Sequence, residues 1–406
     1  MKLRDYQERI SKECHQKLVK YGFCYLALEV RLGKTLTALA ACGLVEAKEV
    51  LFVTKKKAIS SIQGDYSNFG FDYNITIVNY ESLHKIEATK WDVVILDEAH
   101  SMGAIAKPSL RAKQVKALLL KYGSKVILLS GTPTPESFSQ MYHQVYGIKG
   151  NPFSEFKNFY RFCDKHVDVT ERKINGFNIK DYSGGRQSII DAMKPYTINF
   201  SQAEAGFKVD TKEHKLYVEM SQMTYAIADK LKKDLVVEGQ NEVILADTSV
   251  KLMTKLHQIY SGTVKFESGN SAIIDLSKAQ FIYDNFSLVK IGIFYKFKEE
   301  LNALKQVYGD SLCTELEEFN NTKKTIALQI VSGREGISLR NAVALIYYNI
   351  DFSATSYWQS RDRMTTKERL TSDVYWVFAK GGIEDSIYKA VMQKQNFTLA
   401  HFKRTL

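Results

Sequence analysis

The chain has 406 residues, of which 45% are hydrophobic and 25% charged, and this balance excludes a mainly disordered protein. Lysine and arginine number 56 against 45 acidic residues, so the net charge of +11 favours a polyanionic partner, although a merely basic surface gives the same number. The length suits two domains rather than one.

The five cysteines are widely scattered and include no CxxC pair, which argues against a disulfide framework and against a zinc site. No apolar run approaches the roughly 20 residues that a membrane span needs. The N-terminal sequence MKLRDYQERI lacks the apolar segment of a signal peptide. We therefore expect a cytoplasmic protein that makes no membrane contact.

Short apolar runs alternate with helix-length segments through the first third of the chain. The runs are residues 23–28, 50–54, 75–80, 92–96 and 125–129. Near-continuous hydrophobic strands separated by helices are typical of a parallel sheet covered on both faces. The pattern predicts a first α/β domain over residues 1–200.

The same pattern returns late in the chain, in residues 290–294, 325–331, 343–348 and 373–378. The middle differs, because EHKLYVEMSQMTYAIADKLKKDLV and TSVKLMTKLHQIY have the helical spacing of apolar residues. We therefore predict an α/β fold with two parallel-sheet domains in tandem. The expected boundaries are 1–200 for the first domain, 201–275 for a helical insertion or linker, and 276–406 for the second domain.

Two further segments could contact nucleic acid. The aromatic-rich segment 153–162, FSEFKNFYRF, predicts an amphipathic helix buried on the first domain, and stacking on bases is the alternative. Lys55, Lys56 and Lys57 directly follow a predicted strand, where they could track a phosphate backbone or simply form a solvated face.

Residues 28–35, LEVRLGKT, lie between the first apolar run and the helical pattern TLTALAACGLVEA. A strand, a loop and a helix in this order form a phosphate cradle, in which backbone N–H groups and the helix N-terminus hold the phosphates. The glycine usual at the first position is Leu28 here, so an accidental turn before a helix is the alternative. The candidate phosphate-binding residues are Leu32, Gly33, Lys34 and Thr35, with Lys34 on the phosphates and Thr35 on Mg²⁺.

Two acidic residues follow the apolar run 92–96. The segment DVVILDEAH places Asp97 and Glu98 at the carboxyl end of a buried strand, where α/β sheets hold their ligand-binding groups. Asp97 is the candidate to hold Mg²⁺, and Glu98 is the candidate to polarise the attacking water. A strand that merely ends in acidic turn residues is the alternative. Together with Lys34, these carboxylates fit the in-line attack of water on a γ-phosphate.

A third polar group follows the apolar run 125–129. It consists of Ser130, Gly131 and Thr132 in the segment LLSGTPTPES. Such a group is a plain turn when it stands alone, but as the third strand-terminal feature in order it predicts a functional segment.

The order of LRDYQ (3–7), EVRLGKT, DEAH and SGTP resembles the N-terminal motor domain of superfamily 2 helicases and translocases. Within that superfamily the likeness is to the chromatin-remodeller-like, Swi/Snf-type branch, and closest to small phage-encoded DEAH-box DNA helicases. LSKAQ (276–280), IVSGREGISLRNA (330–342), DFSATSYWQSRDR (351–363) and GGIEDSIYKAVMQKQ (381–395) are similar to the second motor domain. The resemblance covers nearly the whole chain and implies two RecA-like domains that bind ATP between them.

The resemblance also implies roles for single residues. Gln7, in the LRDYQ segment with Arg4, matches the glutamine that reads adenine. The residues that match those coupling hydrolysis to motion are His100, Ser130, Gly131 and Thr132. The second-domain residues that match those facing the nucleotide are Gly336 and Gln359. Arg363 matches the family's first arginine, while the second is Thr366 here, and the nearby cations Arg361, Lys367 and Arg369 are candidates for a shifted finger.

In the remodeller-like branch the loop runs Asp-Glu-Met-Gly-Leu-Gly-Lys-Thr, so the resemblance accounts for Leu28. Arg31 replaces the middle glycine of that loop. It must either fit the turn or add a positive charge beside the phosphates.

We therefore expect an ATP- and Mg²⁺-dependent DNA helicase or double-stranded DNA translocase that grips DNA through phosphate contacts. A nucleotide-gated DNA-binding or loading module with little hydrolysis, and a DEAH-type RNA helicase, are the alternatives. A replication or recombination protein is a candidate partner. If a phage encodes the chain, its place is the cytosol of the bacterial host.

Overall fold

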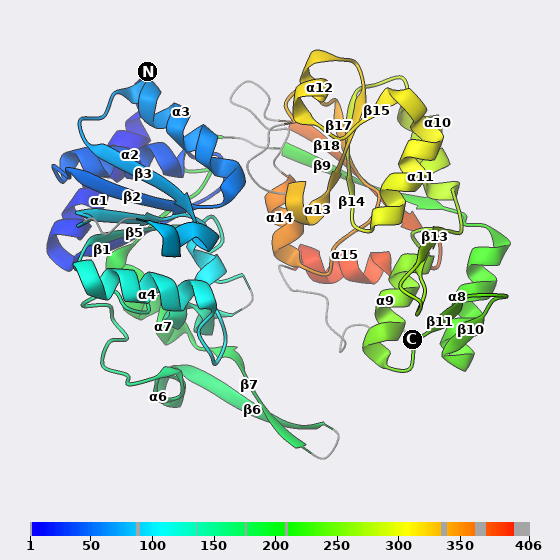
Figure 1. Cartoon of the computed structure of the whole chain (residues 1–406), viewed down its shortest axis with the longest axis horizontal. Helices are drawn as coiled ribbons and strands as arrows, with labels where there is room; N and C mark the ends of the chain where they lie inside the picture. The colour runs from blue at the N-terminus through cyan, green and yellow to red at the C-terminus, as the bar shows by residue number, and fades with distance from the viewer. Residues whose placement is uncertain are drawn as a thin grey trace. The chain divides into compact units, whose positions relative to one another are not determined.

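The computed structural model describes residues 2–86, 90–135, 137–174, 177–207, 210–333, 339–361 and 371–393. The chain divides into two compact units, residues 1–206 and 207–406, and each is built on a six-stranded sheet (Figure 1). The predicted α/β fold with two parallel-sheet domains is confirmed. Among the helices of the described residues, none has both the length and the apolar character to cross a membrane.

The sheet of the first unit has the strand order β3-β2-β4-β5-β1-β8, and all its neighbours are parallel. Its strands are β1 (Phe23–Leu28), β2 (Glu49–Thr54), β3 (Asn74–Asn79), β4 (Val93–Leu96), β5 (Lys125–Leu129) and β8 (Thr197–Phe200). The first five lie within one residue of the apolar runs, because central strands buried on both faces are almost wholly apolar. The short edge strand β8 gave no such signal.

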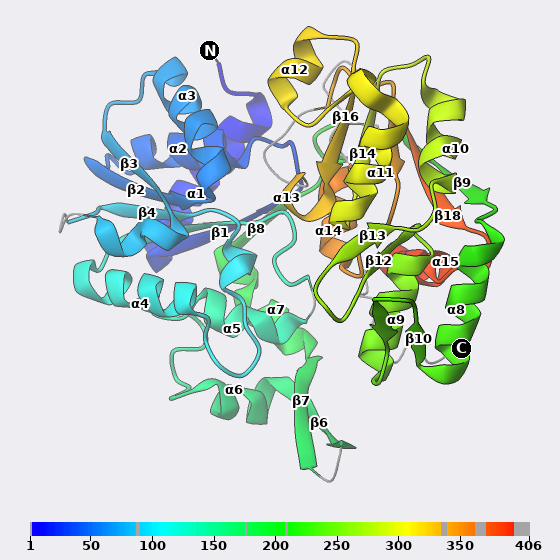
Figure 2. The same cartoon turned by 45° about the vertical axis from the view of Figure 1, so that its right-hand side comes forward.

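Helices cover both faces of this sheet. They are α1 (Asp5–Tyr21), α2 (Lys34–Leu44), α3 (Ile59–Phe69), α4 (Leu110–Tyr122), α5 (Met141–Gln144), α6 (Phe159–His166) and α7 (Gln187–Met193). Figures 1 and 2 both show α2 and α3 on one side of the sheet and α4 and α7 on the other. This arrangement leaves the carboxyl ends of the parallel strands, and the loops that follow them, along one edge of the sheet.

The aromatic segment 153–162 is only partly helical. Residues 152–155 form turns, and α6 begins after Asn158, whose side chain accepts a hydrogen bond from the Arg161 amide (3.1 Å). The predicted burial of the segment is confirmed by Phe153 and Phe162. The helix α6 leads into an antiparallel hairpin, β6 (Val167–Ile174) and β7 (Phe177–Gly185), that projects from the unit (Figure 1).

The sheet of the second unit has the order β15-β16-β14-β17-β18-β9 and is also parallel. Its strands are β9 (Asp210–Val218), β14 (Ile291–Tyr295), β15 (Leu312–Cys313), β16 (Thr325–Gln329), β17 (Ala344–Tyr347) and β18 (Thr371–Ala379). Four of them match the predicted runs. β9 was missed, because Lys212, Lys215 and Tyr217 are exposed on this edge strand and interrupt its apolar pattern.

The structure therefore differs from the helical insertion that we expected over residues 201–275. This segment contains the helices α8 (Gln222–Asp234) and α9 (Ser249–Ile259), but it also contributes β9 to the second sheet. Two hairpins lie in the same segment, formed by β10 (Val236–Glu238) with β11 (Val243–Leu245) and by β12 (Thr263–Lys265) with β13 (Ser271–Ile273). From residue 207 onward the segment clusters with the second unit.

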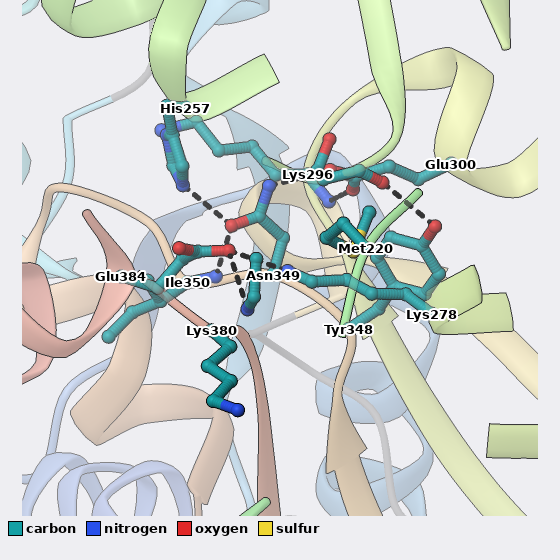
Figure 3. A network of polar contacts seen from close by, with 12 residues as sticks. Met220, His257, Lys278, Lys296, Glu300, Tyr348, Asn349, Ile350, Lys380 and Glu384 are labelled. Atoms are coloured by element: carbon teal, nitrogen blue, oxygen red, sulfur yellow. Dashed lines mark hydrogen bonds and ion pairs between the residues drawn. The ribbon is translucent and has the colours of Figure 1, made fainter. Parts of the chain in front are cut away.

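The remaining helices of the second unit are α10 (Ser277–Phe286), α11 (Lys298–Tyr308), α12 (Leu316–Asn321), α13 (Ile330–Gly333), α14 (Ala354–Arg361) and α15 (Glu384–Met392). A buried ion pair joins the first of them to the last. Lys278 Nζ lies 2.6 Å from Glu384 Oε1, and both side chains are fully buried (Figure 3). LSKAQ and GGIEDS, two segments noted for their resemblance, thus meet in the core of this unit.

A second buried network lies beside this pair (Figure 3). Asn349 Nδ2 donates to Glu300 Oε1 (2.6 Å), which leaves Asn349 Oδ1 to accept from His257 Nε2 (2.6 Å). Burial lowers the pKa of His257 well below its usual range, so the ring is neutral and donates through Nε2. Burial raises the pKa of Glu300, although Asn349 opposes that shift. These polar groups fix helices α9 and α11 against the sheet.

Candidate nucleotide-binding site

The loop of residues 29–33 joins β1 to α2 in the first unit. Arg31 and Gly33 both have left-handed backbones, with φ of 64° and 72°. Left-handed residues at alternate positions turn successive N–H groups to one side, which creates a concavity that binds anions. Lys34 Nζ donates to the Leu28 carbonyl (3.2 Å), so its ammonium lies back over the loop. The loop has the form that a phosphate cradle requires.

Gly33 is required by close packing as well as by its backbone. A Cβ atom at this position would lie 2.2 Å from Gln7 Nε2. Gln7 is almost fully buried, donates through Nε2 to the Leu32 carbonyl (3.3 Å) and accepts at Oε1 from the Arg4 amide (3.0 Å). The structure therefore brings Arg4, Gln7, Leu32 and Gly33 together at the start of α1.

Asp97 follows β4 and is fixed through both carboxylate oxygens. Oδ2 accepts from the Thr54 hydroxyl (2.7 Å), and Oδ1 accepts from the Glu98 amide (3.0 Å). Burial and the neighbouring Glu98 carboxylate raise the pKa of Asp97 to about 6, while Thr54 and the Lys34 ammonium oppose the shift. Two adjacent carboxylates, of which Asp97 is destabilised in its charged form, favour a bound cation, so these residues fit Mg²⁺.

Glu98 adopts a left-handed backbone, with φ of 48°. For a residue other than glycine this conformation costs roughly 1–2 kcal/mol. It directs the chain into a turn in which His100 Nδ1 lies 3.2 Å from Glu98 Oε2 and 2.9 Å from Ser130 Oγ. His100 thus connects the acidic pair to the segment that follows β5.

That segment packs against the phosphate loop. A Cβ at Gly131 would lie 3.5 Å from both Lys34 Nζ and Val30 Cγ1. Ser130 is fully buried and its Oγ accepts from the Thr132 amide (3.1 Å). The Thr132 hydroxyl is buried and makes no hydrogen bond within the described part of the chain.

Several residues of the site escaped sequence reasoning. The Thr54 hydroxyl fixes Asp97, and the Tyr80 hydroxyl donates to the Asp97 carbonyl (2.7 Å). Gln144 accepts from the Tyr25 hydroxyl (2.7 Å) and donates to the Pro133 carbonyl (2.6 Å). Thr54 had one usable signal, since it is the only polar residue in the apolar run VLFVT.

Other predicted site residues are not placed in this cluster. Thr35 lies in the first turn of α2 and is partly buried. Gly336 and Arg363 lie outside the described residues. Gln359 belongs to α14, but its side chain is also outside them.

Arg361 lies in the second unit beside an acidic residue of β9. Its Nε is 3.5 Å from Glu213 Oε1. Glu213 Oε2 accepts from Trp376 Nε1 (3.2 Å) and from the Tyr388 hydroxyl (2.8 Å). The guanidinium therefore lies within ion-pair distance of a carboxylate that aromatic side chains fix.

A family model described as an SNF2-related domain matches residues 50–263. The chain belongs to the SNF2-related family. This membership confirms the resemblance to the Swi/Snf-type branch.

The chain is similar to the SWI/SNF-related matrix-associated actin-dependent regulator of chromatin subfamily A-like protein 1 of Xenopus laevis, with 22% identity over 343 residues. That match covers 79% of this chain and 34% of the relative, so the chain spans about a third of its length. Helicase SWR1 of Saccharomyces cerevisiae is 22% identical over 43% of this chain and 12% of its own length. Among solved structures, the Sulfolobus solfataricus SWI2/SNF2 ATPase core in complex with dsDNA aligns with 16% identity and a TM-score of 0.43, covering 100% of this chain and 93% of that one.

Proposed function

We propose that this member of the SNF2-related family is a Mg²⁺-dependent ATPase that uses hydrolysis to translocate along double-stranded DNA. The observation that carries the proposal is the meeting of Lys34, Asp97 and Glu98 beside a loop shaped for phosphates. Bound Mg²⁺ would neutralise charge on the β and γ phosphates. Asp97 and Thr35 are the residues that would hold it.

The other residues of the site have complementary roles in this proposal. Lys34 binds the β and γ phosphates, as the lysine of such loops does. Glu98 accepts a proton from, or orients, the attacking water, because it lies next to the metal-binding carboxylate. Gln7 contributes to recognition of adenine from its place in α1, against the loop.

His100, Ser130 and Thr132 couple the state of the phosphates to the rest of the unit. His100 Nδ1 lies close to both Glu98 and Ser130, so a change at the acidic pair can alter the hydrogen bond between His100 and Ser130 at the end of β5. The buried Thr132 hydroxyl has a hydrogen bond to gain when that segment moves.

DNA is proposed as the polymer on two grounds, the net charge of the chain and its similarity to a known protein. The net charge of +11 favours a polyanion. One solved structure similar to this chain is described as an ATPase core in complex with dsDNA. Binding through the phosphates of DNA does not depend on base sequence, and its affinity falls steeply as the salt concentration rises.

The test compares ATP turnover with duplex DNA, single-stranded DNA, RNA and no polymer, at low and at high salt. We expect duplex DNA to stimulate turnover most, and the stimulation to fall as salt rises. Glu98→Gln is the matched control, since it keeps size and polarity but loses the base, and we expect turnover to fall roughly 10²- to 10⁴-fold. Absence of stimulation by any polymer at low salt would contradict the motor. Strongest stimulation by RNA would favour the RNA helicase instead.

A nucleotide-gated DNA-binding or loading module is the second candidate. The pairing of Arg361 with Glu213 favours it, because a guanidinium held there leaves fewer arginines for catalysis. Such a module would bind DNA in an ATP-dependent way, and Glu98→Gln would not change its slow turnover.

Strand separation and cellular setting are also proposals. Displacement of a third strand from a triplex reports translocation, while release of one strand of a duplex reports helicase activity. On resemblance alone, we propose that small phage-encoded DNA helicases are functionally close to this chain. We propose the bacterial cytosol as its place and a replication or recombination protein as its partner.

A further inference from the structure

Arg31 lies in the middle of the phosphate loop and has no role in the function proposed above. Its φ of 64° is a left-handed conformation that glycine adopts freely and other residues adopt at a cost. Gly33, two residues later, has the same kind of backbone and is a glycine. The chain therefore carries arginine where glycine would be the more stable choice. A strained residue at a functional site suggests that its side chain is used.

The backbone before Arg31 is held in place by the segment that follows β8. Gln202 donates through Nε2 to the Val30 carbonyl (2.9 Å) and through its amide to Glu29 Oε2 (2.7 Å). The Glu29 amide donates to the Phe200 carbonyl (3.0 Å).

The backbone after Arg31 is held by side chains of α1. The Leu32 carbonyl accepts from the Tyr6 hydroxyl and from Gln7 Nε2, each at 3.3 Å. Arg31 thus sits on a turn whose two neighbouring carbonyls are both fixed. The conformation at this position is imposed by the surrounding chain, so a glycine placed there would keep the same loop.

The chemistry of the side chain suits the ligand of the loop. Arg31 comes three residues before Lys34 and is partly buried. A guanidinium presents a planar fork of donors that matches two phosphate oxygens, whereas an ammonium acts as a point charge. An arginine rooted within the loop can reach the phosphates that the loop cradles.

We infer that Arg31 is a phosphate-binding residue whose guanidinium binds the nucleotide's polyphosphate from within the loop, alongside Lys34. This inference rests on the proposed ATP site. Arg31 would then be a second cationic side chain of the first unit, besides Lys34, that binds the same phosphates.

The test is Arg31→Gly, with Glu46→Gly as its matched control. Glu46 is exposed, follows α2 and is also left-handed, with φ of 57°. Both changes replace a left-handed residue with glycine, so we expect both thermal midpoints to stay equal or rise. Calorimetric titration with Mg-ATP and Mg-ADP measures affinity. We expect Arg31→Gly to bind both nucleotides about 10- to 100-fold more weakly, as the loss of a charged hydrogen-bonding group predicts, and Glu46→Gly to bind as the wild type does.

Arg31→Asn provides a second variant, because asparagine tolerates the left-handed region but carries no charge. It should lose affinity as Arg31→Gly does, and Arg31→Lys should retain part of it. Unchanged nucleotide affinity in Arg31→Gly and Arg31→Asn would overturn the inference. A lower thermal midpoint in both variants would also overturn it, since Arg31 would then serve the loop's structure. If the wild type binds no ATP, the proposed function itself fails.

Discussion

The carboxylates Asp97 and Glu98 form a site that suits a cation but lowers the stability of the folded protein when no cation is bound. Without a cation the two charges repel each other in a partly buried place. Burial and that repulsion both raise the pKa of Asp97, and the Thr54 hydroxyl and the Lys34 ammonium offset only part of the effect, because the pKa still rises from 3.8 to about 6. A group with a raised native pKa contributes stability below its unfolded pKa, and that contribution is lost as the pH rises through the native value.

We therefore predict that Asp97→Asn stabilises the nucleotide-free protein at pH 8, by roughly 1–2 kcal/mol after allowance for solvent access. The gain should shrink as the pH falls from 6 to 4, where the wild-type carboxyl is protonated. The side-chain amide introduced at position 97 can keep both contacts, because it can donate to the Thr54 hydroxyl and accept from the Glu98 backbone N–H. Thermal unfolding across this pH range without nucleotide measures the effect.

Asp92 is the control for that prediction, since it lies just before the same strand. Burial raises its pKa, but the Glu49 and Lys48 amides outweigh burial, so the pKa is lowered overall. Asp92→Asn should therefore destabilise the protein at pH 8, and the loss should diminish towards pH 3. A destabilised Asp97→Asn at pH 8 would contradict the account of the acidic pair.

The two candidate arginines of the second unit can be separated by experiment. Arg361 is held by Glu213, whereas Arg363 lies outside the described residues. We predict that Arg363→Ala lowers DNA-stimulated kcat by about 10³-fold or more, as expected for an arginine finger, and leaves the thermal midpoint unchanged. Arg361→Ala should instead destabilise the second unit by roughly 1–3 kcal/mol, because it leaves the Glu213 carboxylate with one partner fewer. The reverse pattern would make Arg361 the finger.

Sequence reasoning identified the residues of the site that stand in contiguous motifs after a strand. Lys34, Asp97, His100 and Ser130 are brought together because parallel strands end at one edge of the sheet. The sequence did not identify Thr54, because a single polar residue at the end of a strand commonly has no functional role. The conformation of Arg31 was left open, since whether a residue is left-handed depends on contacts made from distant segments.

At the scale of whole elements, a buried ion pair links α15 to α10 in the second unit. Lys278 and Glu384 lie 106 positions apart, and neither side chain is accessible to solvent. Such a pair gives little stability over an apolar pair, but the loss of one partner leaves a buried charge uncompensated.

We predict that Glu384→Gln destabilises the second unit by about 3–5 kcal/mol, and that the double variant Lys278→Met with Glu384→Leu recovers most of the loss. Lys389→Met is the control, because Lys389 belongs to the same helix and forms an exposed pair with Asp385. Its effect on the free energy of unfolding should be small beside that of Glu384→Gln, because an exposed ion pair contributes little. Urea unfolding gives all three values. A double variant no more stable than Glu384→Gln would show that the charges themselves are needed.

The elements themselves were predictable to the extent that they are buried. Every central strand of both sheets gave an apolar run. The short strands β8 and β15 and the exposed edge strand β9 did not, because an edge strand has polar residues on its solvent side.

At the scale of the molecule, the first unit contains every strand of its own sheet. Its last strand, β8, pairs with β1 and ends at Phe200, and Gln202 then bonds to the phosphate loop. We predict that residues 1–206 produced alone unfold cooperatively, and that a chain ending at residue 196 does not, because β1 would then lose a neighbour. Thermal unfolding followed by circular dichroism distinguishes the two. Equal cooperativity in both would mean that β8 is dispensable.

The second unit is closed differently, and this affects how the chain is made. Its first strand, β9, pairs along nine residues with its last, β18, from Thr371↔Asp210 to Ala379↔Val218. A ribosome releases the first unit with its sheet complete, but about 150 residues separate the end of β9 (Val218) from the start of β18 (Thr371), its neighbour. Until β18 has been synthesised, the second unit lacks that strand, and β9 has no partner strand. The time between the two events is when the nascent chain is most exposed to misfolding and proteolysis.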